Sequence, residues 1–147
     1  MKTALIELYS RDIQKLADEI NHYKDEKMLW ITAAGISNSG GNLCLHLVGN
    51  LNHFIGSVLG RSGYQRERDK EFSLKDIPVA ELTSMIEKTK EVVVNTLSSM
   101  TQKDLELDFP QKMFDKLQKT DFMLLHLLAH LNYHLGQINY HRRLLEK

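Results

Sequence analysis

A leucine-rich stretch near the end of the chain carries four of its seven histidines at helical spacing; it reads FMLLHLLAHLNYHLGQINYHRR, residues 122–143. At about 100° per residue, the polar side chains of this row fall within an arc of roughly 80° on a helix. They are His126, His130, His134, Gln137 and His141. Leucines fill the adjoining arc, which predicts a helix packed against a core. That packing requires the leucines, but it does not account for a row of histidines.

His130 and His134 lie four residues apart, a spacing with a specific chemical use. On a helix these two side chains lie one above the other and can direct two nitrogens at one cation. Two partly exposed histidines on a helix flank explain the same spacing without any metal. A third candidate ligand elsewhere in the chain would favour the metal.

That candidate lies in residues 37–60, which read SNSGGNLCLHLVGNLNHFIGSVLG. A narrow polar stripe there includes His46, Asn50 and His53 and runs beside an apolar helical face. If this helix packs beside the last one, His46 can meet the HxxxH pair. Three imidazoles would then surround one divalent metal and leave positions open for water or substrate.

Two segments resemble the signature segments of the DinB-like (YfiT-like) superfamily of metalloenzymes: HLVGN at residues 46–50 and HLNYHLGQI at residues 130–138. The run NSGGNLCLHLVGNL is similar to one branch of that superfamily, and Trp30 falls where such proteins often carry a tryptophan. The resemblance covers most of the chain. It implies an all-α four-helix bundle of the DinB/YfiT-like type with an inward-facing metal site.

By motif position, the resemblance implies that the ligands are His46, His130 and His134 and that the cofactor is a divalent ion such as zinc, nickel or iron. Asn50 and Gln137 are predicted to support the site, because a side-chain amide can orient an imidazole or a bound water.

His53 lies about two turns beyond His46, roughly 10 Å along the helix axis, which is too far to bind the same ion. His126 and His141 are likewise displaced along the last helix. All three could line a pocket or contact a ligand, and plain solvation explains them equally well.

The length of 147 residues fits one domain with a substantial core, spanning residues 1–147. Four helices are expected: residues 2–21, a segment that follows the capping cluster 37–41 and ends near Gly60, a segment opened by Asp76, Ile77 and Pro78, and a last helix capped by Thr120. Long connections follow the second and third helices. The connection after the second helix is expected to be a charged loop. The connection after the third helix, residues 101–119, is expected to hold a short helical turn at 111–118. Such connections need not give a simple up-and-down bundle.

Charge, hydropathy and cysteine content limit the partners and the cellular compartment that can be expected for this protein. The chain has 19 basic and 19 acidic residues, so it lacks the net positive charge expected of a nucleic-acid-binding protein. No apolar run is long enough to cross a bilayer and no signal peptide is recognisable, so we expect a cytoplasmic protein without a membrane partner. Cys44 is the only cysteine, which excludes an internal disulfide and agrees with a reducing compartment. We interpret it as a small buried hydrophobe.

A three-histidine metal site with an open position can activate water or hold a thiol as thiolate. Hydrolysis usually requires a carboxylate base beside the metal, and no Asp or Glu falls on either histidine stripe. Thiol transfer requires less, since the nucleophile arrives on the cosubstrate. Some DinB-like proteins are low-molecular-weight thiol S-transferases, and the resemblance implies that class, with a small-molecule substrate. We also expect a homodimer.

Two other functions stay open. One is a non-catalytic bundle that binds a metal or a small ligand, or simply dimerises; the other is a metal-dependent hydrolase, which would act on amides or esters without added thiol. The charged connection contains Arg61, Arg66 and Arg68, interpreted as residues of a solvated loop or as contacts for an anionic cosubstrate. Because imidazole binds metal only when neutral, metal affinity and stability should fall as the pH drops through about 6, and the metal-free protein should lack that loss.

Overall fold

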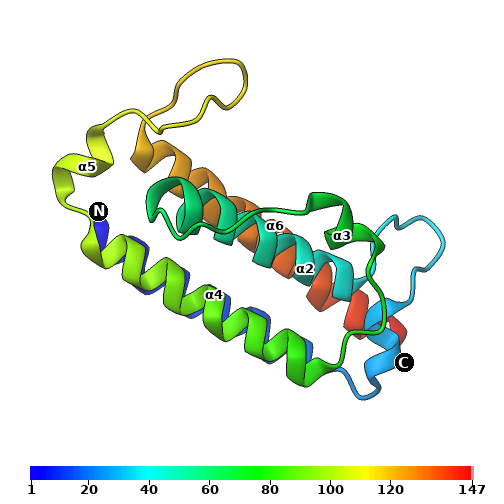
Figure 1. Cartoon of the computed structure of the whole chain (residues 1–147). Coiled ribbons are helices and arrows are strands. Elements are labelled where there is room, and N and C mark those ends of the chain that lie inside the picture. Colours follow the sequence, from blue (N-terminus) through cyan, green and yellow to red (C-terminus); the bar gives the residue numbers. More distant parts are fainter. Residues whose placement is uncertain (147) are drawn as a thin grey trace.

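The computed structural model describes residues 1–146 and has six α-helices in that part of the chain (Figure 1). Four of them form a bundle: α1 (Lys2–Asn21), α2 (Gly40–Leu51), α4 (Val79–Ser99) and α6 (Thr120–Leu145). The others are short and lie in the connections: α3 (Arg68–Ser73) and α5 (Gln102–Glu106). A 3-10 helix, η1 (Glu26–Trp30), follows α1, and a π-helix, η2 (Asn52–Leu59), continues α2. The predicted all-α bundle is confirmed.

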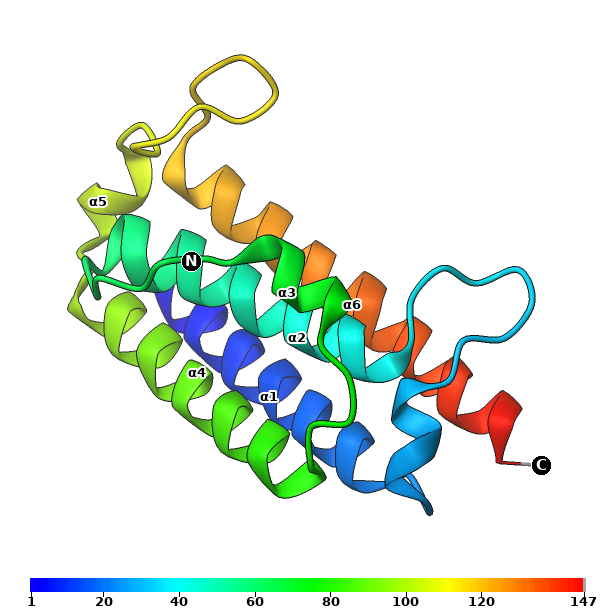
Figure 2. The ribbon, with the colours of Figure 1, turned by 45° about the vertical axis from the view of Figure 1, so that its right-hand side comes forward.

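The four long helices do not alternate in direction. α1 and α6 run the same way, because Tyr9 near the start of α1 bonds the Leu124 carbonyl and Glu19 near its end bonds Asn139. α4 runs opposite to α1, with Lys2 bonded to the Ser98 carbonyl. α2 and α4 are parallel, so the chain between them returns along α2 (Figure 2). The long second connection makes this arrangement possible.

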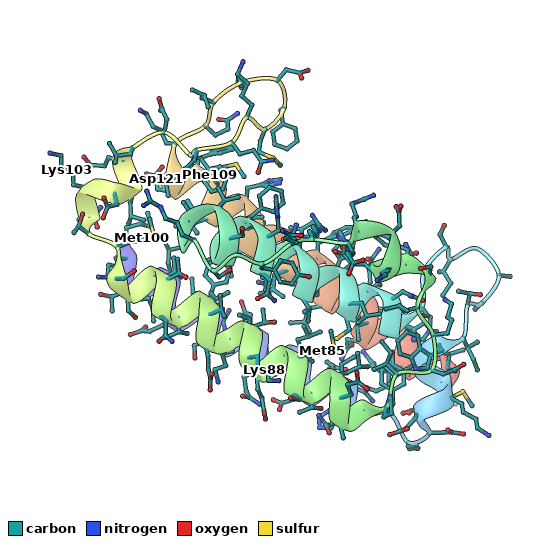
Figure 3. The ribbon with its side chains drawn as sticks, viewed as in Figure 1. Met85, Lys88, Met100, Lys103, Phe109 and Asp121 are labelled. Carbon is teal, nitrogen blue, oxygen red and sulfur yellow. The ribbon has the colours of Figure 1, made fainter. Side chains whose placement is uncertain are left out.

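The core forms because each long helix repeats apolar residues every three or four positions. On α1 these are Leu5, Tyr9, Ile13, Leu16 and Ile20, each at most 1% exposed. The buried Tyr9 hydroxyl donates a 2.6 Å hydrogen bond to the Leu124 carbonyl, which offsets the cost of removing it from water. At the end of the bundle where α6 begins, Phe109 is fully buried, with its ring 6.4 Å from that of Phe54 (Figure 3).

α2 is the central helix of the fold, and all of its residues are buried. It contains no charged residue, as expected for a helix covered on every side. Ser39 caps it by accepting a hydrogen bond from the Asn42 amide, in agreement with the capping cluster predicted there. The segment that returns along α2 supplies its outermost cover, and Asn42 ties that segment down by donating to the Glu71 and Leu74 carbonyls.

Three local predictions were wrong. The charged connection is not a loop throughout, because residues 68–73 form α3. The second connection has its helical turn at α5 rather than at 111–118. Thr101 and Asp104 form a capping box at the start of α5, and this local sequence signal favours a helix there. Thr120 does not cap α6, since its hydroxyl donates to the Leu107 carbonyl and Lys119 occupies the capping position.

Candidate metal centre

Three histidines meet where α2 packs against α6. His46, His130 and His134 each offer one ring nitrogen, and these three atoms lie within 4.8 Å of one another. His46 comes from the centre of α2, and the other two occupy successive turns of α6. The structure therefore brings together the three residues that the sequence singled out as ligands.

The separations are close to those that one ion requires. Nitrogens about 2.0–2.1 Å from a tetrahedral zinc ion lie roughly 3.3 Å apart. The Nε2 atoms of His46 and His130 are 3.1 Å apart. The upper limit of 4.8 Å within the group is wider than the tetrahedral value, so closing all three nitrogens on an ion would require a ring to turn inward.

Two of the three imidazoles are held by an outer hydrogen bond. His46 Nδ1 donates to Glu71 Oε1 over 3.0 Å, and His134 Nδ1 donates to Gln137 Oε1 over 2.7 Å. Each bond places the proton on Nδ1 and leaves the lone pair of Nε2 for a ligand contact, as in many metal sites of proteins. Gln137 thus contacts a site histidine, where the sequence predicted a supporting role for it.

Glu71 is the site residue that the sequence did not reveal. Its side chain is 7% exposed and is gripped by Arg66, whose Nε and Nη2 donate to Oε2 and Oε1 over 2.8 Å each. Arg66 is therefore mostly buried against Glu71 rather than a solvated loop residue. A Cβ atom at Gly49 would overlap the Glu71 carboxylate, so the glycine makes room for it. Glu71 lies on α3, a short charged segment in which no apolar periodicity predicts a buried position.

Asn50 and His130 carry buried atoms without a hydrogen-bond partner. Within residues 1–146, these atoms are Asn50 Oδ1 and His130 Nδ1. The support predicted for Asn50 is therefore not formed in this structure. If His130 binds an ion through Nε2, its Nδ1 must carry a proton, which would then need an acceptor. The orphaned nitrogen and the all-imidazole donor set fit a zinc, nickel or iron ion.

Burial keeps two of the histidines neutral. It lowers the pKa of His130 to about 4, with a further contribution from the nearby His134 and His46. Burial also lowers the pKa of His46, although the hydrogen bond to Glu71 opposes that effect. Near pH 7 both rings are in the form that binds a metal.

The other histidines lie outside the group. The His53 ring is on η2 against Phe54, at 4.7 Å between ring centroids. The His126 ring packs on Phe114 at 5.4 Å. His141 is buried; it accepts a hydrogen bond from the Tyr23 hydroxyl and donates one to the Ile31 carbonyl. It is a packing residue that links α6 to the loop before α2.

A pocket of about 450 Å³ lies beside the group. His134 and Gln137 form part of its wall, and the rest includes Leu43, Tyr133 and Tyr140. A small molecule placed there would reach His134 directly. The wall combines apolar side chains with several polar groups, among them Ser37 and Asn38, a composition common in small-molecule sites.

In the described part of the chain, no helix has the length and hydropathy needed to cross a bilayer.

A comparison with curated proteins finds no match. A family model described as "Protein of unknown function (DUF1572)" matches residues 3–147. Because the match covers nearly the whole chain, this protein belongs to the DUF1572 family of proteins of unknown function.

Proposed function

We propose that this protein is a metal-dependent low-molecular-weight thiol S-transferase of the DinB-like superfamily, with His46, His130 and His134 as the ligands of a divalent ion. The observation that carries the proposal is the convergence of three imidazole nitrogens within 4.8 Å, at the end of a small-molecule pocket. When bound, the ion would act as a Lewis acid that favours the thiolate form of the cosubstrate.

The position of Glu71 favours thiol transfer over hydrolysis. The carboxylate lies behind His46, on the Nδ1 side, and both of its oxygens are engaged by Arg66. It can orient the imidazole, but it does not face the space between the three ligand nitrogens. The group formed by the described residues contains no carboxylate, so the site offers no evident base for activating water.

The chain's own cysteine does not supply the thiol. Cys44 is fully buried, and burial raises the pKa of its thiol to about 12, so it stays protonated and unreactive. The nucleophile would therefore come from a low-molecular-weight thiol bound in the pocket beside His134. The residues of the chain would hold that thiol, exclude water with Leu43 and Tyr133, and direct its sulfur to the metal.

The proposal includes a cytoplasmic location, because a free buried cysteine and a thiol cosubstrate both suit a reducing compartment. It includes a small-molecule substrate and no nucleic-acid partner, since the net charge is zero.

Metal content and thiol consumption test the proposal together. Wild-type protein, His130→Ala and His53→Ala are purified identically, analysed for metals and then assayed for loss of free thiol with a small electrophilic acceptor. We expect about one metal per chain and thiol transfer in wild type and in His53→Ala, and neither in His130→Ala. Metal without transfer would favour a ligand-binding bundle. Turnover of esters or amides without added thiol would favour a hydrolase.

A further inference from the structure

The outer face of α6 is apolar and open to solvent. Five large side chains there are at least 44% exposed: Phe122, Leu125, Tyr133, Tyr140 and Leu144. Ala129 and Gly136 lie between them and are also exposed. At 100° per residue these seven positions share an arc of about 100°; we call them the α6 outer face. An exposed patch of this extent is typical of a contact surface.

The bundle itself does not need this face. The opposite side of α6 already supplies the core with buried residues that include Leu124, Leu127, Leu131 and Ile138. α6 lies at one edge of the bundle, next to α1 and α2 (Figure 2). A surface helix normally has one apolar stripe, so a second one indicates a second packing partner.

The order of side-chain sizes along the α6 outer face is nearly the same in both directions. Tyr133 is at the centre, with the small Ala129 and Gly136 on either side of it. Phe122 and Leu144 lie equally far from Tyr133 in the sequence. A two-fold axis that passes near Tyr133 and pairs two antiparallel helices would place large residues opposite large ones and small opposite small. Self-complementarity of this kind is what a two-fold interface requires.

The charges at the ends of the face agree with an antiparallel pair. Asp121 lies at the start of α6 (Figure 3) and Arg143 near its end, on the same flank of the α6 outer face by helical count. Equivalent flanks meet in an antiparallel two-fold pair, so Asp121 of each copy would face Arg143 of the other. A parallel pair would instead bring like charges together at both ends.

The surface relief is complementary as well. Tyr140 separates two grooves of about 450 and 550 Å³, both beside the second half of α6. Phe122 and Leu125 project from the first half. An antiparallel arrangement brings these projecting side chains over the grooved half of the other copy, and the two-fold axis repeats the contact.

We propose that two copies of this chain associate through the α6 outer face, antiparallel and with the two-fold axis near Tyr133. The second copy would then border the pocket next to His134, because Tyr133, Tyr140 and Leu144 belong both to the face and to the pocket wall. This inference depends only on the fold and the surface, so it does not require the proposed metal or activity.

Cysteine cross-linking tests the arrangement directly. Cys44 is buried and can remain in place as an unreactive background. Under mild oxidation, Tyr133→Cys is expected to form a disulfide-linked dimer, whereas Phe122→Cys alone is not. A mixture of Phe122→Cys and Leu144→Cys should cross-link to each other. Cross-linking of Phe122→Cys to itself would show a parallel pair, and a Tyr133→Cys protein that does not cross-link would contradict the two-fold axis; either result overturns the proposal.

Solution mass provides the second test. Light scattering of the wild type should give twice the chain mass of 17.0 kDa. Leu125→Asp should raise the dimer dissociation constant by at least about 100-fold, since it places a charge among the apolar side chains of the α6 outer face. Leu107→Asp is the matched control, because Leu107 is 53% exposed but lies outside α6, and it should stay dimeric. A monomeric wild type, or a Leu125→Asp variant as dimeric as the control, would refute the interface. Metal content is measured in the same variants; if it is unchanged, a failure of the dimer proposal leaves the proposed metal site unaffected.

Discussion

Nδ1 of His46 and Oε1 of Glu71 are 3.0 Å apart, although the two residues belong to different helices and are separated by the whole of η2. The bond fixes the tautomer of the imidazole and turns Nε2 toward His130, from which it is 3.1 Å away. Arg66 in turn balances the charge of Glu71. The geometry of the candidate ligand on α2 is thus set by a segment that returns along that helix.

We predict that Glu71→Gln lowers metal affinity about 10–100-fold, the effect usual for an outer partner of a metal-binding histidine. The amide keeps the shape of the side chain but not its charge, so the imidazole loses a strong acceptor and Arg66 loses its counterion. Affinity is measured by competition with a chromogenic chelator. Glu67→Gln is the control, since Glu67 is 64% exposed and pairs with Lys70 on the surface. An equal effect of both substitutions would remove Glu71 from the site.

Gly49→Ala should destabilise the protein by about 1–3 kcal/mol, because the added methyl group overlaps the Glu71 carboxylate in a tightly packed place. Gly136→Ala is the matched control on α6, where a Cβ atom meets nothing within 4 Å of its own copy. Both changes are made in the Leu125→Asp background, so that the proposed contact of Gly136 with a second copy does not affect the comparison. Gly136→Ala should stabilise the helix by roughly 0.5–1 kcal/mol through its better helix propensity. Urea denaturation at neutral pH compares the two variants. If Gly49→Ala were as stable as its Leu125→Asp parent, α3 would not be seated against α2 as described.

Metal-free protein should lose stability as the pH falls from about 6.5 toward 4. The pKa of His130 is near 4 in the folded state, below the value of the unfolded chain, so between these values the unfolded state binds a proton that the folded state does not. The pKa of His46 is shifted in the same direction. This loss is separate from the metal-linked one, which metal-free protein is still expected to lack. Unfolding curves at pH 7 and pH 5 with chelator present measure the change.

The control for that experiment is His130→Gln, which removes the larger of the two pKa shifts. The stability of this metal-free variant should therefore depend less on pH. A variant with the same dependence as wild type would assign the effect to other groups.

Removing the metal should lower the melting temperature without unfolding the protein. Free metal at 100 times its dissociation constant adds about 2.7 kcal/mol to the stability of a fold that alone binds it. For a chain of this size, each kcal/mol shifts the melting temperature by about 2–4 °C. The core is formed by apolar side chains from all four long helices and includes none of the three histidines, so the metal-free bundle keeps its helices. Differential scanning calorimetry of metal-loaded and chelated samples tests this; coincident midpoints would argue that no ion links α2 to α6.

Asn50→Ala and Gln137→Ala should each weaken metal binding less than His130→Ala does. Gln137 accepts a hydrogen bond from His134, whereas the buried Asn50 oxygen has no hydrogen-bond partner among the described residues. Neither residue belongs to the three converging nitrogen donors, so removing either one leaves three donors in place. Metal retention during dialysis compares the three variants. A loss for Asn50→Ala equal to that of the histidine variant would identify Asn50 as a ligand.

The long helices could be predicted from the sequence because their signals are local. α1 was predicted at 2–21 and is Lys2–Asn21, since its apolar period and its ends depend only on neighbouring residues. The approach of His130 to His134 is equally local, because one helical turn separates them. The place of His46 beside that pair could be predicted only on the condition that the two helices pack side by side.

Only the tertiary structure decided what surrounds those histidines. α3 has six residues and no apolar period, and it forms where Asn42 and the His46–Glu71 contact tie the returning chain to α2. No spacing rule connects Glu71 to His46 or gives Gly49 its role, because both depend on the path of the chain between α2 and α4. The same holds for the unpaired Asn50 oxygen, whose environment is set by side chains from other helices. Local periodicity therefore determined which residues line the centre of the bundle. Long-range packing determined which of these residues have a hydrogen-bond partner from another helix.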